Sequence, residues 1–191
     1  MIKILRPAVA VLAAALVIWG VVAFLARDEQ PGAPPLGGTM RNFTVAGAPS
    51  PAPRTDLVAR DGTKTSLAAH AGKLVVANFW ATWCGPCIRE MPSLVRLQEK
   101  LAGTDAIVLA LSEDLNGWPM IAPFVREHRL EGLTILHDAE AATGRALKVS
   151  ALPTTVLFDP DGRELGRLTG PAEWDAPEAL ALIRYYLGPA R

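Results

Sequence analysis

The stretch that decides the fold runs from Leu74 to Cys87 and reads LVVANFWATWCGPC. Its first half, Leu74–Trp80, is a nearly continuous apolar run, which is typical of a strand buried on both faces of a sheet. Its second half ends in Cys84-Gly85-Pro86-Cys87 and leads into a segment with helical periodicity. The stretch therefore predicts a buried strand, a tight turn and a helix that begins at the two cysteines.

The start of a helix is a favourable place for a reactive cysteine. Unpaired backbone amides and the helix dipole favour a negative charge there, so we expect the thiolate of Cys84 to be stabilised. Pro86 suits the first helical turn because its missing N–H would have no partner there. A spacing of three residues puts Cys87 within reach of the Cys84 sulfur. We expect Cys84 to be the exposed attacking thiol and Cys87 the more buried thiol that breaks the mixed disulfide.

Other interpretations of the cysteine pair are open on this evidence. Zinc sites need four ligands, and the chain has only two cysteines, while His70, His128 and His137 stand isolated. The two thiolates alone could bind Cu(I). A structural disulfide between residues three apart would close a short loop and constrain little. The preceding strand, Pro86 and the neighbouring Trp83 favour a redox-active pair.

The segments around this stretch alternate between strand and helix patterns. Asp61-Gly62 predicts a hairpin upstream, and Asp175 with Glu178 matches a capping box. The other patterns predict helices over Cys84–Leu101, Trp118–Arg129, Ala139–Leu147 (interrupted by Gly144) and up to Leu187, and strands over Ala106–Leu111, Leu133–Leu136, Thr154–Phe158 and Arg163–Leu168. Helices between the early strands imply parallel connections, and the tight turn at Asp159–Gly162 implies an antiparallel return. The sequence thus predicts an α/β fold with a mixed central sheet flanked by helices.

The N-terminal part of the chain carries a long apolar segment. Ala8–Leu25 has no charged residue, and as a helix it would span about 27 Å, close to the hydrocarbon thickness of a bilayer. Lys3 and Arg6 precede it, which favours an N-terminus on the inside. A cleavable signal peptide would have a shorter apolar region and a better cleavage site than the one after Ala26. We predict an uncleaved signal-anchor over residues 1–27 that exports the rest of the chain.

The amino-acid composition indicates how the rest of the chain is organised and which classes of protein it excludes. Residues 28–54 hold six prolines and four glycines, which predicts an extended linker, and residues 55–191 suffice for one compact domain. Nineteen basic residues balance nineteen acidic ones, so the chain lacks the basic surplus that nucleic-acid binding needs. Two cysteines allow at most one intrachain disulfide, which excludes a disulfide-stapled scaffold.

Taken together, the motifs resemble one known family. Asn78–Cys87 is similar to the active-site strand, turn and helix of thioredoxin. Arg89–Pro92 resembles the membrane-anchored extracytoplasmic branch, the TlpA, ResA and DsbE (CcmG) thiol-disulfide oxidoreductases. Leu152–Gly162 resembles the cis-proline loop and last hairpin of this family, and Gly170–Trp174 looks closest to TlpA. The resemblance covers roughly Leu57–Leu187 and implies a thioredoxin-like domain with an N-terminal hairpin extension.

The resemblance implies catalytic roles for individual residues. Cys84 and Cys87 match the nucleophile and the resolving cysteine, and Pro153 matches the cis-proline that faces the disulfide. Cytoplasmic thioredoxins carry a buried aspartate where this chain has Asn78, and an amide cannot accept a proton from Cys87. Glu90 matches a glutamate linked to active-site function in the TlpA/ResA-like branch, and helical spacing puts it on the Cys87 side. Partly buried, it would have a raised pKa and could move protons; the alternative is a solvated helix glutamate.

Substrate binding and partners follow from the same resemblance. The backbone at Leu152 would pair with an extended client, beside Trp83, Gly85 and Pro86. The implied function is a membrane-anchored reductase of disulfides in exported clients, either apocytochrome c or copper-site proteins. A membrane thiol reductant of the DsbD/CcdA type would re-reduce the pair, and no cofactor or metal is needed.

Three competing functions are a disulfide-donating thiol oxidase, a Cu(I)-binding assembly factor and a redox-inert binding module. Gly85-Pro86 is the dipeptide of reducing thioredoxins, which argues against the oxidase. The chain has no cluster of methionine or histidine, and the implied cis-proline at Pro153 would bar a metal-binding geometry at the thiols, so both features argue against copper.

Overall fold

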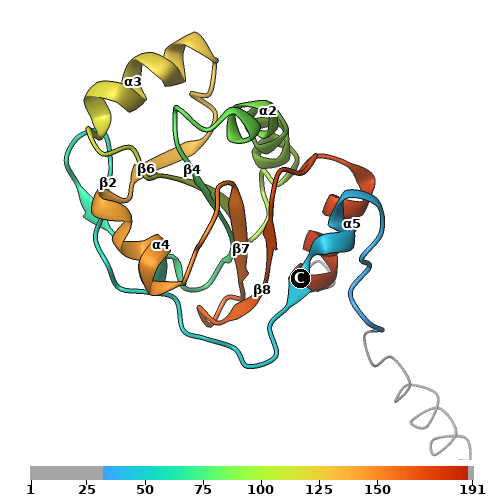
Figure 1. Cartoon of the computed structure of the whole chain (residues 1–191). Coiled ribbons are helices and arrows are strands. Elements are labelled where there is room, and N and C mark those ends of the chain that lie inside the picture. The colour runs from blue at the N-terminus through green and yellow to red at the C-terminus, as the bar shows by residue number, and fades with distance from the viewer. Residues whose placement is uncertain (1–31, 189–191) are drawn as a thin grey trace, which may run out of the picture. The chain divides into compact units, whose positions relative to one another are not determined.

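A mixed β-sheet with helices around it forms the described part of the chain, residues 32–188 of this computed structural model (Figure 1). The strands are β1 (Thr44–Val45), β2 (Leu57–Val58), β3 (Lys64–Thr65), β4 (Leu74–Trp80), β5 (Ala106–Ser112), β6 (Thr134–His137), β7 (Thr154–Phe158) and β8 (Glu164–Thr169). The α-helices are α2 (Gly85–Lys100), α3 (Trp118–Glu127), α4 (Ala142–Ala146) and α5 (Pro177–Leu187), and three 3₁₀ turns are η1 (Gly38–Asn42), η2 (Leu67–His70) and η3 (Ala139–Ala141).

The sheet order is β1-β8-β7-β4-β5-β6-β2-β3. β4 pairs in parallel with β5, and β5 pairs in parallel with β6, because helices α2 and α3 carry the chain back between them. β7 and β8 run antiparallel because the Asp159–Gly162 turn joins them directly, with the N–H of Gly162 donating to the carbonyl of Asp159 at 2.9 Å. β2 and β3 form the predicted hairpin at one edge. The predicted mixed sheet is confirmed.

Side chains of β4 alternate between two hydrophobic cores, one on each face of the sheet. Val76 and Trp80 lie in the core that α2, α3 and α5 cover, whereas Val75 and Phe79 lie in the core that η2 and the end of α4 cover. All seven residues of β4 are buried, as its continuous apolar run predicts. Packing on both faces of the sheet therefore fixes the end of β4 at Trp80. The turn that leads to Cys84 starts from this fixed point.

The folded unit extends further toward the N-terminus than the sequence predicts. Met40 in η1 is fully buried and Phe43 nearly so, and both belong to the core of α2 and α5. β1 pairs with β8, and Pro51 forms an isolated bridge with Arg163. The proline-rich composition of residues 28–54 predicts a linker, but the Met40 and Phe43 side chains pack in the core and the backbone of β1 pairs with the edge of the sheet.

The buried Met40 leads to a stability prediction. We expect Met40→Ala, made in the full chain, to lower the free energy of unfolding by about 2 kcal/mol, because the truncation leaves a cavity in the core. Urea unfolding followed by tryptophan fluorescence measures this. Leu36→Ala is the matched control, since Leu36 is 37% exposed, and it should leave the midpoint nearly unchanged. Equal midpoints for Met40→Ala and the unmodified protein would show that η1 is not part of the cooperative unit.

The predicted capping box at the last helix is wrong. Ala176 occupies the N-cap of α5, and no side chain caps the helix. The Asp175 carboxylate instead accepts from Arg96 Nε at 2.7 Å and lies 3.6 Å from Lys100 Nζ, both on α2. Glu178 accepts from the backbone N–H of Thr39. Both carboxylates of the expected capping box therefore make long-range contacts, Asp175 through ion pairs and Glu178 through a backbone hydrogen bond.

Two helix boundaries also differ from the prediction. α3 ends at Glu127 rather than Arg129, and Arg129 itself adopts a positive φ of 54°. The helical segment that begins at Ala139 breaks at Glu140 and Ala141, which both adopt left-handed backbone conformations, and runs on through Gly144. Gly144 serves a close approach to a neighbouring carboxylate, described below, and not a break.

The predicted signal-anchor, residues 1–27, lies outside the described residues. Within residues 32–188, no helix combines the length and the apolar character needed to cross a bilayer.

Candidate active site

The two cysteines form a disulfide at the start of α2. Cys84 is the N-cap residue in an extended conformation, and its Sγ accepts from the backbone N–H of Cys87 at 3.3 Å. The Cα atoms of the pair are 5.3 Å apart. Pro86 lies in the first helical turn, as predicted. The Cys87 amide at the helix start points at the Cys84 sulfur, which favours a thiolate on Cys84 once the disulfide is reduced.

The cysteines differ in accessibility less than the sequence predicts. Cys87 is fully buried, whereas Cys84 keeps 5% of its surface exposed and borders an open groove. Cys84 is thus the only one of the two cysteines that can be reached from the groove, although it is not an exposed residue. The strongly exposed neighbour is Trp83, at 70%, which makes a large apolar surface beside the sulfur.

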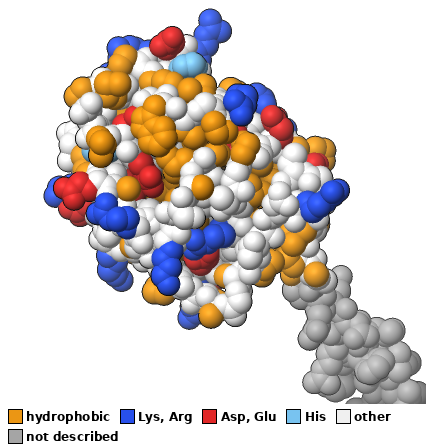
Figure 2. All heavy atoms as spheres, in the orientation of Figure 1, with side chains coloured by type: hydrophobic (Ala, Val, Ile, Leu, Met, Phe, Trp, Pro, Cys, Tyr) orange, Lys and Arg blue, Asp and Glu red, His pale blue; other side chains and the backbone are white. Residues whose placement is uncertain are grey.

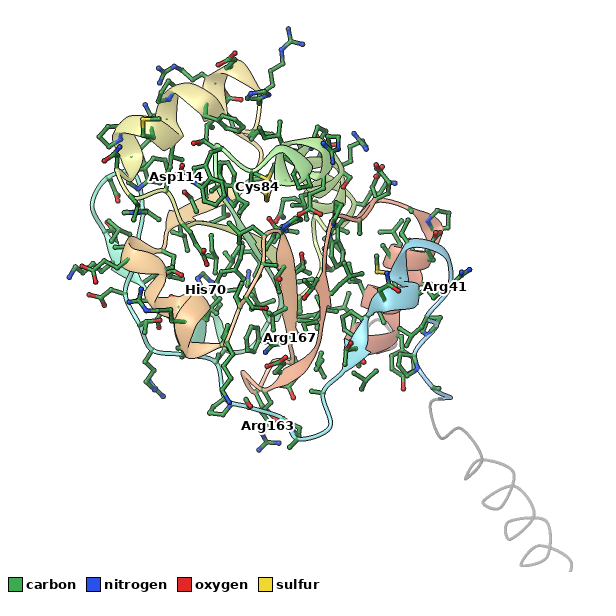
Figure 3. All side chains as sticks on the ribbon, in the orientation of Figure 1. Arg41, His70, Cys84, Asp114, Arg163 and Arg167 are labelled. Atoms are coloured by element: carbon green, nitrogen blue, oxygen red, sulfur yellow. A yellow bond between two sulfur atoms is a disulfide. The ribbon has the colours of Figure 1, made fainter. Side chains whose placement is uncertain are left out.

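A buried carboxylate that the sequence analysis did not single out holds the turn before Cys84. Asp114, just beyond β5, accepts from Thr82 Oγ1 at 2.6 Å and from the Thr82 N–H at 3.0 Å, and also from Ser112 Oγ at 2.7 Å (Figure 3). The carboxyl ends of neighbouring parallel strands meet at one edge, so β5 delivers this group beside the end of β4. The available signal was an acidic residue two positions after a buried parallel strand, which places it at this edge of the sheet but does not show which turn it will hold.

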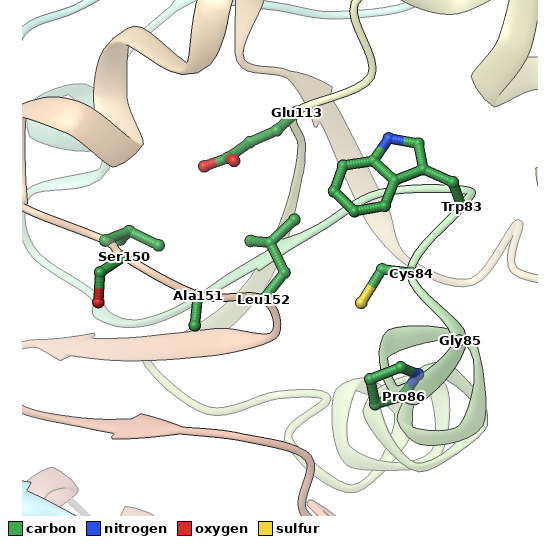
Figure 4. Close-up of a pocket in the computed structure, with 9 residues that line it drawn as sticks. Trp83, Cys84, Gly85, Pro86, Glu113, Ser150, Ala151 and Leu152 are labelled. Carbon is green, nitrogen blue, oxygen red and sulfur yellow. The ribbon is translucent and has the colours of Figure 1, made fainter.

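The groove beside Cys84 has a volume of about 500 Å³ and runs between the helix start and the loop before β7 (Figure 4). One wall is Trp83–Pro86, and the other is Val149–Leu152. The peptide bond between Leu152 and Pro153 is cis. Figure 2 shows hydrophobic side chains gathered on this face, between α2 and α3. The structure therefore brings the predicted residues Cys84, Trp83, Gly85, Pro86 and Leu152 to one concave surface.

Glu90 lies in the core under the disulfide, one helical turn after Cys87. Only 2% of its surface is exposed, so it is not a solvated helix glutamate. Its Oε1 accepts from Asn78 Nδ2 at 2.6 Å and its Oε2 from the Ala172 N–H at 3.0 Å. Burial raises the pKa of this carboxyl to about 7, although both hydrogen bonds oppose the rise. Glu90 can therefore hold or release a proton near neutral pH.

Asn78 joins Glu90 to the strand that follows the cis-proline. Its amide nitrogen donates to Glu90 Oε1 and, at 2.9 Å, to Thr155 Oγ1 on β7. Asn78 is fully buried, and its Oδ1 has no hydrogen-bond partner among residues 32–188. Asn78 orients Glu90 but carries no titrating group, so the buried carboxyl at this position comes from α2 rather than from β4.

Known proteins are similar to this chain in sequence and in fold. Residues 37–183 match the family model described as Redoxin. The chain belongs to the Redoxin family. It is 33% identical over 116 residues to a thiol-disulfide oxidoreductase ResA of Bacillus cereus, covering 61% of this chain and 64% of that protein. It is 30% identical over 142 residues to ResA of Bacillus subtilis, covering 71% of this chain and 77% of that protein.

A solved structure agrees with the Redoxin-family fold. A chain from Chlorobium tepidum, assigned as a thiol:disulfide interchange protein DsbE, superposes with a TM-score of 0.67 at 27% identity, covering 76% of this chain and 100% of that one. The described fold is thus thioredoxin-like, with a mixed sheet and flanking helices. The match to the Bacillus cereus relative spans a little under two thirds of that protein's length.

One further residue of this Redoxin-family chain borders the groove and was missed by the sequence analysis. Glu113, the residue after β5, lines the groove together with Trp83 and Cys84 (Figure 4). Its neighbour Asp114 binds Thr82 in the turn before Cys84. Of these two successive acidic residues, one thus holds the turn and the other lines the groove. No short-range motif distinguishes Glu113, because only the three-dimensional arrangement brings it to the cysteines.

Proposed function

We propose that this chain is a thiol-disulfide oxidoreductase that reduces disulfides in exported client proteins. The observation that carries the proposal is the Cys84–Cys87 disulfide at the start of α2, facing a groove with a cis-proline loop on its far side. A reactive cysteine at a helix start, next to an extended backbone that a client can pair with, is an arrangement suited to disulfide exchange.

The reaction begins with the reduced pair. The Cys84 thiolate attacks one sulfur of the client disulfide, so that a Cys84–client disulfide forms, the client disulfide breaks and one client thiolate leaves. Cys87 then gives up its proton and attacks Cys84 Sγ. The Cys84–Cys87 disulfide forms and the second client thiolate departs. Two electrons have passed to the client, and its two thiolates take up two protons.

Glu90 is the group that accepts the proton of Cys87 in this scheme. The two residues are three apart on α2, a spacing that places side chains on the same face, and both are buried. A carboxyl with a pKa of about 7 is ionised in a large fraction of molecules at neutral pH, yet it releases the proton again easily. Pro153 and Leu152 would hold the client segment across the groove while these steps take place.

The same proposal includes a membrane anchor and an extracytoplasmic location. Its support is the uncharged Ala8–Leu25 segment with Lys3 and Arg6 before it, followed by a proline-rich stretch that leads into the folded unit from Pro35 onward. In an oxidising compartment, where free thiols tend to become oxidised, a dedicated reductant has a use. Among the members of the family branch, the Gly170–Trp174 segment favours a TlpA-like protein.

The proposed clients are apocytochrome c, whose haem-attachment cysteines must be reduced, or copper-site proteins of respiratory oxidase assembly. The proposed electron donor is a membrane thiol reductant of the DsbD/CcdA type. These partners rest on the resemblance of the motifs at Asn78–Pro92 and Leu152–Gly162 to the TlpA, ResA and DsbE branch.

The reduction potential of the cysteine pair tests the direction of the reaction. We expect the full chain, equilibrated with glutathione or thioredoxin couples, to show a potential of about −200 mV or lower, which suits a reductant. The protein should also reduce insulin in the presence of a thiol donor. A potential near about −120 mV, together with efficient oxidation of a reduced model protein, would instead identify a disulfide donor.

A further inference from the structure

Glu113 gives the client groove a local charge. Of the described residues that line the groove, Glu113 is the only charged one; the others are Trp83, Cys84, Gly85, Pro86, Val149, Ser150, Ala151 and Leu152. Figure 4 shows Glu113 at the edge of this groove, with its side chain extending away from Trp83 toward the side of Ser150. A client segment lying along Leu152 with its cysteine at Cys84 would therefore pass this carboxylate.

The Glu113 carboxylate is half-buried and lacks a compensating partner. Within residues 32–188 it makes no hydrogen bond and no salt bridge through its side chain. Gly144 packs against it so closely that any side chain at that position would meet Glu113 Oε1. Glu113 Oε1 thus faces the backbone of α4 at Gly144, whose N–H donates to Asp138 and not to Glu113.

The charges around Glu113 favour the binding of a cation next to its carboxylate. Burial is the largest influence on Glu113 and raises the pKa of its carboxyl to about 6, and the carboxylate of Asp138 adds to the rise. Asp138 is itself buried and accepts from the N–H groups of Thr143 and Gly144. Arg145 opposes the rise, but it is an exposed side chain that donates to the carbonyl of Glu140. Asp114 turns away to Thr82.

A half-buried carboxylate without a partner favours any ligand that brings a positive charge to it. We propose that Glu113 selects clients that carry a lysine or arginine within a few residues of the disulfide to be reduced, by pairing with that cation in the groove. This inference rests on the proposed reductase function, because the groove is the client site only if Cys84 attacks client disulfides. A cation seated there would neutralise the single charge that the groove leaves uncompensated.

Peptide disulfides provide the test. A set of short peptides, each with one intramolecular disulfide, carries a single lysine or a single glutamine at one of the positions within about two residues of the attacked cysteine. The second-order rate constant for oxidation of the pre-reduced full chain is measured for each pair. At pH 7.5 we expect the lysine peptide to react about fivefold faster than its glutamine partner for at least one position.

The preference should depend on Glu113 and on its ionisation. In Glu113→Gln the lysine-to-glutamine rate ratio should fall to about one, whereas Glu131→Gln should keep the ratio. Glu131 is an exposed glutamate in the loop before β6, at the other end of the parallel strands, so it matches the change in net charge. In the unmodified protein the ratio should shrink toward one as the pH falls from 7.5 to 5, because Glu113 gains a proton. The ionisation of the protein's thiols affects the rate constants of both peptides equally, so it does not change their ratio.

The outcomes separate this inference from the proposed function. Reduction of all peptides with a ratio near one at every position overturns the role of Glu113 and leaves the reductase intact. A ratio that persists unchanged in Glu113→Gln also overturns it. Failure to reduce any peptide overturns the proposed function itself. If Glu113→Gln does not fold, the pH dependence of the ratio in the unmodified protein decides alone.

Discussion

Replacing Cys87 with serine should stop turnover and leave clients covalently attached to Cys84. The hydroxyl of serine is not ionised near neutral pH and cannot attack the mixed disulfide, so the reaction halts after its first step. Multiple-turnover reduction of a protein disulfide should fall by a factor on the order of 10³ or more. The position of Cys84 in the groove and the full burial of Cys87 support these proposed roles.

The trapped adducts would identify the clients. Cys87→Ser, expressed as the full chain in its native host, should yield adducts that migrate slowly on a non-reducing gel and separate when a thiol is added. Mass spectrometry of the released partners would then distinguish apocytochrome c from copper-site proteins. Cys84→Ser is the matched control and should lose turnover equally without forming adducts. Adducts on Cys84→Ser but not on Cys87→Ser would reverse the assigned order of attack.

The sequence predicts most of the fold because its strongest signals are local. The apolar run Leu74–Trp80 must be buried on both faces, and the turn residues at Asp159–Gly162 can hardly continue a strand. The cysteine pair is local as well, since a helix start and a spacing of three residues determine its chemistry. The burial of Glu90 follows from its place on the inner face of α2, three residues after Cys87.

Long-range partners account for what the sequence does not predict. The sequence around Asp175 fits a capping box, but in the structure its carboxylate pairs with Arg96 and Lys100 of α2. Asp114 and Glu113 reach the active site only because β5 lies beside β4 in the sheet. The sequence does not show which neighbouring turn a carboxylate after a strand will bind, or which groove it will line.

Replacing Glu90 with glutamine should remove a pH dependence of stability. In the disulfide form the carboxyl has a pKa of about 7, against its ordinary value of 4.5, mainly because it is buried. The folded protein therefore keeps a proton that the unfolded chain releases, and stability falls as the pH rises through this window. The loss amounts to about 3 kcal/mol between pH 4.5 and pH 8. Glutamine carries no charge, so this decline should be absent from Glu90→Gln.

The contribution of Glu90 is measured as a slope. Glutamine cannot accept the hydrogen bonds from Asn78 and Ala172 in the same way as a carboxylate. Glu90→Gln therefore also changes the free energy of unfolding by an amount that does not depend on pH. Urea unfolding of the oxidised proteins at several pH values between 5 and 8 separates the two effects. Glu99→Gln, an exposed glutamate on the same helix, should follow the unmodified protein throughout.

The same substitution should change the exchange reaction itself. With the proton acceptor removed, the step in which Cys87 attacks the mixed disulfide should slow by about 100-fold at pH 7.5, the range typical of a lost general base. The thiol titration of Cys87 should shift as well, because an ionised Glu90 one helical turn away disfavours the thiolate and glutamine does not. Stopped-flow release of a client thiol and pH-dependent alkylation measure the two effects. Glu90→Gln and Glu99→Gln could instead show the same pH dependence of alkylation and the same rate of attack by Cys87. That result would assign Glu90 a purely structural role, since a change in packing alone would hardly alter the pH dependence.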